Sequence, residues 1–458
     1  MESIYYSLVN IVGEEYVSNQ KEELFIYSQD SGMMDPHEPN FVVLPKSTEE
    51  VEKIVKLSNI EKIPIVVAGG ALSLSGLTIP HQGGIILDLI RMDKVLEVND
   101  NSRYAIIEAG VTTGKLKAYL ERNHPELRFS MPDAPPAATV VGNIVIHGQG
   151  RLSQQYGFNS DMVTGLEVVL PNGEVCKIGS GSVSPYWFAI APLPNLAGLF
   201  LGWYGTTGII TQLGIKLYPK KKLRDVEVFL VEEPKLVPDV VQRVTFTEMP
   251  EDIFIGAQPY PPAYKDLIMI GICITGDTEE ELEFKRKLIW DALRPHIDSK
   301  EGGFMVMTPE IKQELLEIPS SSTTRFADVL KGGGFEYCGP IIPVEKFPEA
   351  YKKLLEISSK YSLTYGSIGR VIGRSHCMMF TFGYPFNRAD SKNIEITKRA
   401  LYDANVASLE IGGVPWKPEV PAQKLIMEKM DKNTLKLMQS MKNFLDPNRI
   451  MNPGNWEV

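Results

Sequence analysis

A run of glycines and other small residues directly after a branched apolar segment is the feature that most constrains this chain. Residues 63–67 (Ile-Pro-Ile-Val-Val) predict a buried strand, and residues 68–76 continue as Ala-Gly-Gly-Ala-Leu-Ser-Leu-Ser-Gly. Small residues let consecutive backbone N–H groups turn inward as a nest, which can solvate a phosphate or pyrophosphate. A glycine-rich tight turn explains the run equally well on its own. The run is neither a Walker loop nor a Gly-x-Gly-x-x-Gly motif.

Length and composition indicate a soluble enzyme of two or three domains, or of one large cofactor domain that carries an insertion. The chain has 458 residues, 43% of them apolar and 23% charged, which excludes long disorder. Its net charge of −10 has the wrong sign for a protein held by nucleic-acid phosphates or anionic lipid. Prolines, glycines and serines interrupt the nearly uncharged stretch 179–219, so we expect no membrane span. Residues 1–30 lack a signal-peptide pattern, which favours a cytoplasmic location.

The four cysteines are widely spaced and form no Cys-x-x-Cys pair. Neither a disulfide framework nor a local iron–sulfur or zinc cluster is indicated. Any iron–sulfur centre would therefore belong to another chain.

The pattern of apolar and charged residues changes near residue 221. Before it, short branched runs alternate with helical patterns, which is typical of an α/β or α+β domain. After it, strand-like runs alternate with long charged helices, and we assign residues 221–420 to a second, α+β domain. Residues 421–458 contain an amphipathic helix that ends at Asp446-Pro447.

Four further motifs follow the glycine-rich run in order. They are residues 105–116 (AIIEAGVTTGKL), residues 139–144 (TVVGNI), Tyr156-Gly157 with residues 165–174 (GLEVVLPNGE), and residues 204–212 (YGTTGIITQ). The chain closes with residues 445–454 (LDPNRIMNPG). Together these segments resemble the vanillyl-alcohol oxidase/p-cresol methylhydroxylase family, which includes the glycolate-oxidase D-subunit-like and D-lactate dehydrogenases. The resemblance implies an α+β fold: a two-subdomain FAD-binding domain (residues 1–220), an α+β substrate cap (221–420), and a tail (421–458) that returns to the FAD domain.

The resemblance also implies where FAD is held. The first loop would bind the pyrophosphate, two positions would pack small backbone against the flavin, and a third segment would line the adenine and ribityl side. Asn452, with Gly454, would close over the isoalloxazine. The implied FAD contacts are Ala68, Gly69, Gly70, Ala71, Leu72, Ser73, Ser75, Gly76, Gly142, Asn143, Gly205, Gly208, Ile209 and Asn452.

The sequence departs from the family at positions that carry chemistry. Ala68 and Ala71 leave the loop without a histidine for covalent attachment of the flavin. Trp203-Tyr204 replaces the Ser-Glu of glycolate-oxidase-type members. Relatives use a two-histidine metal-binding run and a later Glu-His pair, whereas residues 369–376 and 410–413 contain one histidine in total. One imidazole does not make a zinc site, so we expect no catalytic metal.

The candidate catalytic groups lie in the second domain. His376 is the predicted base, with Arg370 and Arg374 as partners for an anionic substrate. A core histidine bonded to a backbone carbonyl is the alternative. Trp416 and Lys417 stand where the phenol-oxidising branch has a tyrosine–arginine pair, so a cation is kept and a phenol hydroxyl is lost.

Another arginine, Arg325, follows a serine- and threonine-rich run and could bind substrate. A polar surface loop explains it equally well.

The predicted reaction is a two-electron oxidation of a carbinol or benzylic carbon, with a proton passing to a base and hydride passing to flavin N5. The substrate would be a small alcohol, phenol or hydroxy acid. Electrons would leave to an iron–sulfur protein, an electron-transfer flavoprotein or another acceptor, and a homo-oligomer is compatible with the sequence. Two alternatives remain open: a D-2-hydroxy-acid dehydrogenase without the usual metal, and a flavin-bearing electron-transfer subunit without a substrate of its own.

Overall fold

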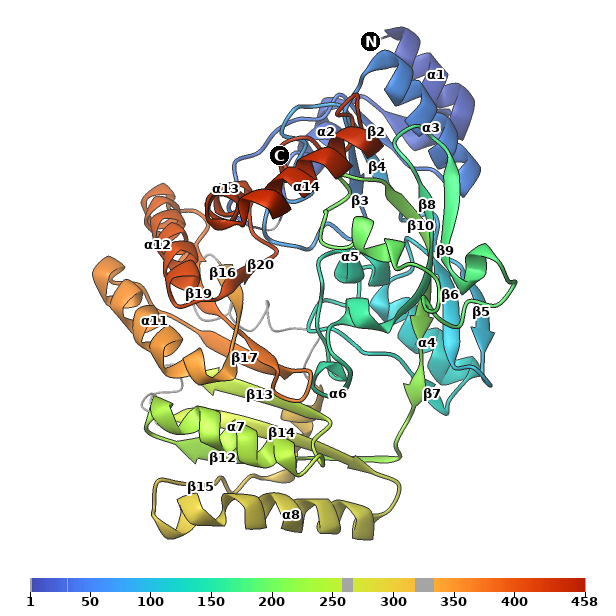
Figure 1. Cartoon of the computed structure of the whole chain (residues 1–458). Helices are drawn as coiled ribbons and strands as arrows, with labels where there is room; N and C mark the ends of the chain where they lie inside the picture. The colour runs from blue at the N-terminus through green and yellow to red at the C-terminus, as the bar shows by residue number, and fades with distance from the viewer. Residues whose placement is uncertain (1, 31, 258–266, 318–332, 458) are drawn as a thin grey trace.

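The computed structural model describes residues 2–30, 32–257, 267–317 and 333–457. Figure 1 shows two smaller sheets built by the N-terminal half of the chain, packed beside a large sheet built by most of the remainder. None of the described helices has the length and apolar character needed to cross a membrane.

The first small sheet carries the glycine-rich run at its edge. Its strand order is β1-β2-β4-β3, and β4 pairs in parallel with both β2 and β3. The strands are β1 (Val17–Ser18), β2 (Phe41–Val43), β3 (Ile65–Ala68) and β4 (Ile85–Asp88). Its helices are α1 (Glu2–Val12), α2 (Lys21–Tyr27) and α3 (Thr48–Glu61), and the Ser47 side chain caps α3 by accepting from the Glu50 N–H.

The second small sheet is antiparallel, in the order β5-β6-β10-β8-β9. One continuous apolar core joins it to the first sheet. Its strands are β5 (Val95–Asn99), β6 (Tyr104–Glu108), β8 (Val163–Val169), β9 (Val175–Gly179) and β10 (Ile209–Lys216). Helices α4 (Thr113–Asn123), α5 (Val140–Val145) and α6 (Ser153–Tyr156) accompany it, and β7 (Leu127–Arg128) pairs with β11 (Tyr218–Pro219).

The large sheet has nine strands in the order β15-β12-β14-β13-β17-β18-β16-β19, with β20 paired to β16. The strands are β12 (Leu223–Val231), β13 (Asp252–Ala257), β14 (Ile268–Gly276), β15 (Gly302–Phe304), β16 (Gly333–Ile342), β17 (Ser367–Ile372), β18 (Cys377–Phe380), β19 (Phe382–Asn387) and β20 (Val414–Trp416). Four helices pack on one face: α7 (Val237–Phe246), α8 (Glu279–Asp298), α11 (Phe347–Tyr361) and α12 (Ser391–Glu410).

Successive side chains of a strand point to opposite faces of the sheet, so the residues between the core positions lie on the face that the four helices do not cover. Ile253 and Ile255 belong to the core under the helices, so their neighbours Asp252 and Phe254 point to the opposite face. We call this opposite side of the large sheet the inner face. A short helix, α9 (Pro309–Glu317), packs near the β12 end of the inner face.

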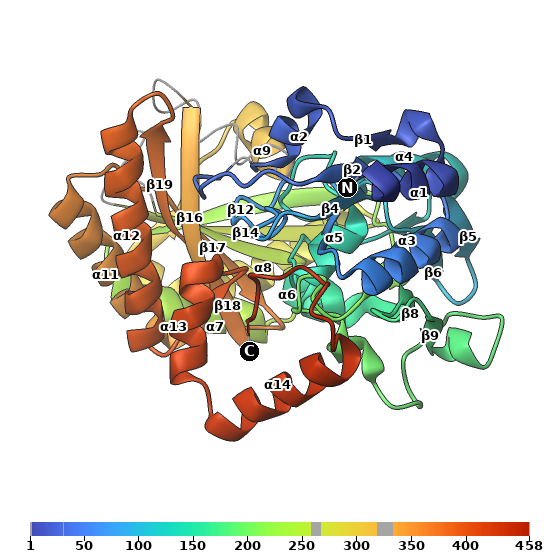
Figure 2. The ribbon, with the colours of Figure 1, turned by 90° about the horizontal axis from the view of Figure 1, so that it is seen from above.

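The C-terminal segment runs back to the first small sheet. Helices α13 (Val420–Lys429) and α14 (Lys432–Leu445) follow β20, and Figure 2 shows α14 along the outside of the molecule. The tail then bonds to β3, because the Ile65 N–H donates to Ile450 O (2.7 Å) and the Asn452 N–H donates to Ile65 O (2.8 Å).

Candidate functional site

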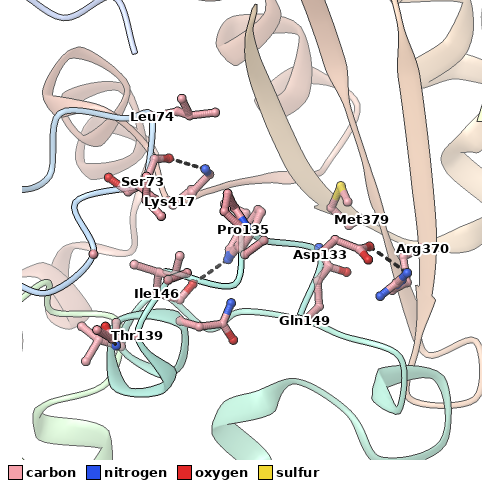
Figure 3. Close-up of a pocket in the computed structure, with 18 of the residues that line it drawn as sticks. Ser73, Leu74, Asp133, Pro135, Thr139, Ile146, Gln149, Arg370, Met379 and Lys417 are labelled. Atoms are coloured by element: carbon pink, nitrogen blue, oxygen red, sulfur yellow. Dashed lines mark hydrogen bonds and ion pairs between the residues drawn. The ribbon is translucent and has the colours of Figure 1, made fainter. Parts of the chain in front are cut away.

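A cavity of about 960 Å³ lies between the small sheets and the inner face of the large sheet. Its lining comes from the glycine-rich run, from the segments around residues 133–151 and 200–210, and from the inner face. Figure 3 shows Ser73 near Lys417 at one side of the cavity and Asp133 near Arg370 at another, with Pro135 between them.

The glycine-rich run after β3 forms an open cradle of backbone donors. None of the N–H groups of residues 70–75 donates a hydrogen bond to another described residue. Ala71 (φ 49°) and Leu74 (φ 69°) adopt left-handed backbone, and such a change of hand turns successive N–H groups toward one side. The Ser73 hydroxyl is also buried without a partner among the described residues. The loop therefore offers unsatisfied donors to an anionic group such as a pyrophosphate.

Gly142 and Gly205 leave two positions of the cavity wall outside this loop without a side chain, and we call this part the bare wall. Gly142 and Asn143 lie on α5 and line the cavity, and the Thr139 hydroxyl holds the start of α5 by accepting from the Gly142 N–H at 3.2 Å. Gly205 has a φ of +76°, and a Cβ there would meet only Val67, at 3.9 Å. A flat ligand can therefore approach the backbone closely at this wall. The donor cradle and the bare wall together fit the pyrophosphate and ring system of FAD.

Most of the FAD contacts implied by the sequence lie on the cavity wall. These are Ala68, Gly69, Gly70, Ala71, Leu72, Ser73, Gly142, Asn143, Gly205, Gly208 and Ile209. Ser75, Gly76 and Asn452 are not among the lining residues.

The positions of these three residues have clear causes. The Gly76 N–H donates to Asp30 Oδ2 at 2.7 Å, and the Ser75 hydroxyl bonds back to Ser73 O at 3.4 Å. Asn452 was expected to close over the flavin. Its Nδ2 donates to the carbonyl oxygens of Leu77 (3.1 Å) and Tyr204 (2.6 Å), so its side chain fastens the tail to two residues of the cavity lining.

Lys417 and Trp416 connect the large sheet to the FAD side of the cavity. The Lys417 ammonium donates to Ser73 O, and Trp416 Nε1 donates to Ile146 O at 2.5 Å. The Lys417 Nζ also lies 4.6 Å from the centre of the Tyr337 ring. Burial raises the pKa of the neighbouring Glu336 to about 8, against the attraction of the Lys417 charge. Lys417, which directly follows β20, thus holds the donor loop in place from the large sheet.

A cluster of charged side chains occupies the other part of the cavity. Arg370 projects from β17 and is 5% exposed; its Nη2 lies 2.7 Å from Asp133 Oδ2 and 3.2 Å from Asp252 Oδ2. Gln149 and Arg151 line the cavity beside them. We call these five residues the polar belt.

Much of the hydrogen-bonding capacity of the polar belt is unused. Arg370 Nε and Nη1, Arg151 Nη2, both amide atoms of Gln149, and the Oδ1 atoms of Asp133 and Asp252 have no hydrogen-bond partner among the described residues. Buried polar atoms without partners are costly, so the belt is suited to a ligand that supplies them. Burial raises the pKa of Asp252 to about 6; Arg370 opposes this shift and Asp133 adds to it.

His376 and Arg374, the predicted base and anion partner, lie outside the cavity lining. Both are exposed in the turn between β17 and β18, where Gly373 and Arg374 have positive φ. Arg374 Nη1 pairs with Glu248 Oε1 at 3.0 Å. The chain reverses before His376, so its closeness to Arg370 in sequence does not bring it to the belt. Arg325 lies outside the described residues.

Four members of the polar belt were not predicted from the sequence: Asp133, Gln149, Arg151 and Asp252. They come from separated segments that only the tertiary fold brings together. One local signal existed in the sequence: Asp252 begins a strand of alternating character (Asp-Ile-Phe-Ile-Gly-Ala). The structure leaves Asp252 1% exposed, and a buried carboxylate needs a partner. Among the residues that the structure describes, no group of three or more His, Cys, Asp or Glu side chains could hold a metal ion.

Comparison with known proteins agrees with this geometry. Residues 39–179 match the model of the FAD binding domain, and residues 269–456 match that of the FAD linked oxidases, C-terminal domain. The solved structure of 4-ethylphenol oxidase from Gulosibacter chungangensis superposes with a TM-score of 0.86 at 20% identity, covering 99% of this chain and 96% of that one. The chain is an FAD-linked oxidase or dehydrogenase by its two matching domains, and its fold is that of 4-ethylphenol oxidase and p-cresol methylhydroxylase.

Two curated relatives show how far this FAD-linked oxidoreductase has diverged. Glycolate oxidase subunit GlcD of Bacillus subtilis (strain 168) is 26% identical over 471 residues, covering 98% of this chain and 95% of the relative. The mitochondrial D-lactate dehydrogenase [cytochrome] of Arabidopsis thaliana is 29% identical over 443 residues, covering 91% of this chain and 73% of the relative. The enzyme is therefore an FAD-linked oxidase or dehydrogenase with the family's α+β architecture.

Proposed function

We propose that this enzyme oxidises the carbinol carbon of a 2-hydroxy acid to a carbonyl, with the substrate's polar end held by the polar belt. The observation that carries the proposal is the set of unpartnered donors and acceptors on Arg370, Arg151 and Asp252, buried in the same cavity as the FAD cradle. The relatives named for glycolate and D-lactate support an acid of this kind.

The two halves of the belt match the two polar groups of such a substrate. The free N–H groups of Arg370 and Arg151 can donate to a carboxylate, and charge-assisted pairs of this kind are the strong ones. The free Oδ1 of Asp252 can accept from the neighbouring hydroxyl. Both groups are satisfied at once only when a carboxylate and a hydroxyl are close together in the ligand.

Asp252 is the proposed base, in place of His376. When bound, FAD supplies the acceptor for the hydride that leaves the carbinol carbon. The hydroxyl proton passes to Asp252, whose pKa of about 6 leaves it mostly ionised at neutral pH and still basic enough to take a proton. Arg370 bridges Asp252 and Asp133 and so holds the base in position. Electrons then leave to a partner protein or a diffusible acceptor.

Oxidation of a benzylic carbon is the second candidate. The rings of Phe335 and Tyr337 line the cavity and offer stacking partners to an aromatic substrate. The lysine at position 417 is then the cation available to a phenolate.

Anaerobic titration of the FAD-loaded enzyme tests the proposal. The panel is glycolate, lactate, longer 2-hydroxy acids, 4-hydroxybenzyl alcohols and aliphatic polyols. We expect the oxidised flavin band to bleach with 2-hydroxy acids and to remain with polyols. Bleaching by the benzylic alcohols alone would favour the second candidate, and bleaching by no member would support a flavin-bearing electron-transfer subunit.

A further inference from the structure

The cavity continues past the polar belt along the inner face of the large sheet, away from the FAD cradle. This continuation runs over β13, β14 and β12 and under α9. Its walls are mostly apolar, although Glu314 of α9 also lines it. We call this part the apolar arm, lined by Val228, Phe254, Met269, Met305, Ile311 and Leu315.

Strand parity and register build the arm directly beside the belt. Phe254 and Met269 both point to the inner face, and Phe254 pairs in register with Arg370 on the next strand. The Phe254 ring lies against Gly271, where an added Cβ would come within 2.1 Å of it. At Gly256 an added Cβ would meet only Met269, whose flexible Cε end lies 3.3 Å away and would have to shift slightly.

The arm is longer than a glycolate or lactate requires. From β17, which carries Arg370, to β12, which carries Val228, there are three strand-to-strand steps, or about 14 Å at the usual spacing. Its lining residues all follow residue 227, whereas the donor cradle and bare wall lie within residues 67–210. FAD held by the cradle and the wall would leave the arm to another ligand.

We propose that the apolar arm binds an aliphatic substituent of the substrate, so that the substrate class is a medium-chain 2-hydroxy acid rather than a two- or three-carbon one. This inference rests on the proposed function. Its support is continuity: the arm opens from the belt that holds the polar end, so an amphipathic molecule fills both at once. Met269 and Met305 are flexible thioethers, which adapt to chains of different length.

Binding of inert chain-length probes tests the arm without turnover. The probes are straight-chain carboxylates from butanoate to decanoate, which carry no hydroxyl to oxidise, added to the FAD-loaded enzyme and followed by calorimetry. We expect the dissociation constant to fall roughly fourfold per added methylene until the arm is full, the usual gain for burying one methylene. A dissociation constant that does not change with chain length would overturn the proposal that the arm binds an aliphatic chain.

Two variants locate the effect. Gly256→Leu places a side chain into the arm and should remove the gain for long chains while leaving butanoate binding unchanged. Gly303→Leu is the matched control, because Gly303 lies on β15 outside the cavity lining and an added Cβ there has no heavy atom within 4 Å. Met269→Ala, which enlarges the arm, should move the best probe to a longer chain. It serves as the decisive variant should Gly256→Leu fail to fold.

These outcomes test aliphatic binding in the arm separately from the proposed reaction. A gain in affinity with chain length that survives in Gly256→Leu, or a best probe that stays the same in folded Met269→Ala, refutes aliphatic binding in the arm. Flavin reduction by 2-hydroxy acids with no preference for long chains would leave the proposed function standing while removing the arm. Tight, length-dependent carboxylate binding without any flavin reduction would uphold the arm and remove the reaction.

Discussion

Replacing Asp252 by asparagine removes the proposed base while keeping the shape of the side chain. Flavin reduction, measured by rapid mixing of FAD-loaded protein with a reducing 2-hydroxy acid, should slow by about 10²- to 10⁴-fold, the scale of positioned acid–base catalysis. In the native enzyme the reduction rate should rise with pH through about 6, because only the ionised carboxylate accepts a proton. In Asp252→Asn that rise should disappear.

The same pKa shift predicts a second, independent signature in stability. The pKa of Asp252 is raised from 3.8 to about 6, so the folded state holds this proton more tightly than the unfolded state does. The contribution of this bound proton to the free energy of unfolding is fully present below about pH 4 and is lost as the pH rises through 6. The loss amounts to about 3 kcal/mol at 1.36 kcal/mol per pKa unit. Asp252→Asn lacks this penalty, so its free energy of unfolding should gain on that of the native enzyme between pH 4 and 7.

A second buried aspartate provides the matched control. Burial also raises the pKa of Asp88, which accepts from the Tyr27 hydroxyl at 2.6 Å and lies outside the cavity lining. Asp88→Asn should change stability but leave the rate and pH dependence of flavin reduction intact. An Asp252→Asn enzyme that keeps the native rate and its rise near pH 6 would refute the assignment of the base.

Three further substitutions probe the cofactor side of the cavity and the role of His376. Lys417→Met removes the donor to Ser73 O and should weaken FAD binding by about 10- to 100-fold, the usual cost of losing a charged hydrogen bond, measured by fluorescence titration of the apoprotein. Gly205→Val introduces a side chain at a φ of +76° on the cavity wall and should yield folded, colourless protein, as shown by circular dichroism and flavin absorbance. His376→Ala changes an exposed turn residue and should leave the rate of flavin reduction within twofold of native; a drop of 10²-fold would return His376 to the mechanism.

The sequence predicted the parts of the site that depend on local backbone and missed those that depend on long-range packing. The loop after Ile65–Ala68 was readable because small residues following a buried strand leave few choices of backbone. Arg370 and Lys417, both named from the sequence, line the cavity, and their predicted roles stay predictions. His376 lies outside the lining, because a tight turn that sequence distance does not reveal carries it away from Arg370. The other four members of the polar belt could not be placed together from the sequence. Asp252 on β13 meets the loop residues Asp133, Gln149 and Arg151 only after the large sheet packs against the N-terminal half of the chain.

Reduction of the flavin in the Arg370→Gln enzyme is the most direct test of the central claim, that the polar belt holds the group being oxidised. Arg370 supplies unpartnered N–H donors to the cavity and bridges the two aspartates, so its loss removes the carboxylate site and loosens the base together. In anaerobic rapid mixing with a 2-hydroxy acid that bleaches the native flavin, Arg370→Gln with full FAD occupancy should need at least tenfold more substrate for half-maximal reduction and should reduce more slowly at saturation. Native concentration dependence and native rate in that variant would contradict the account.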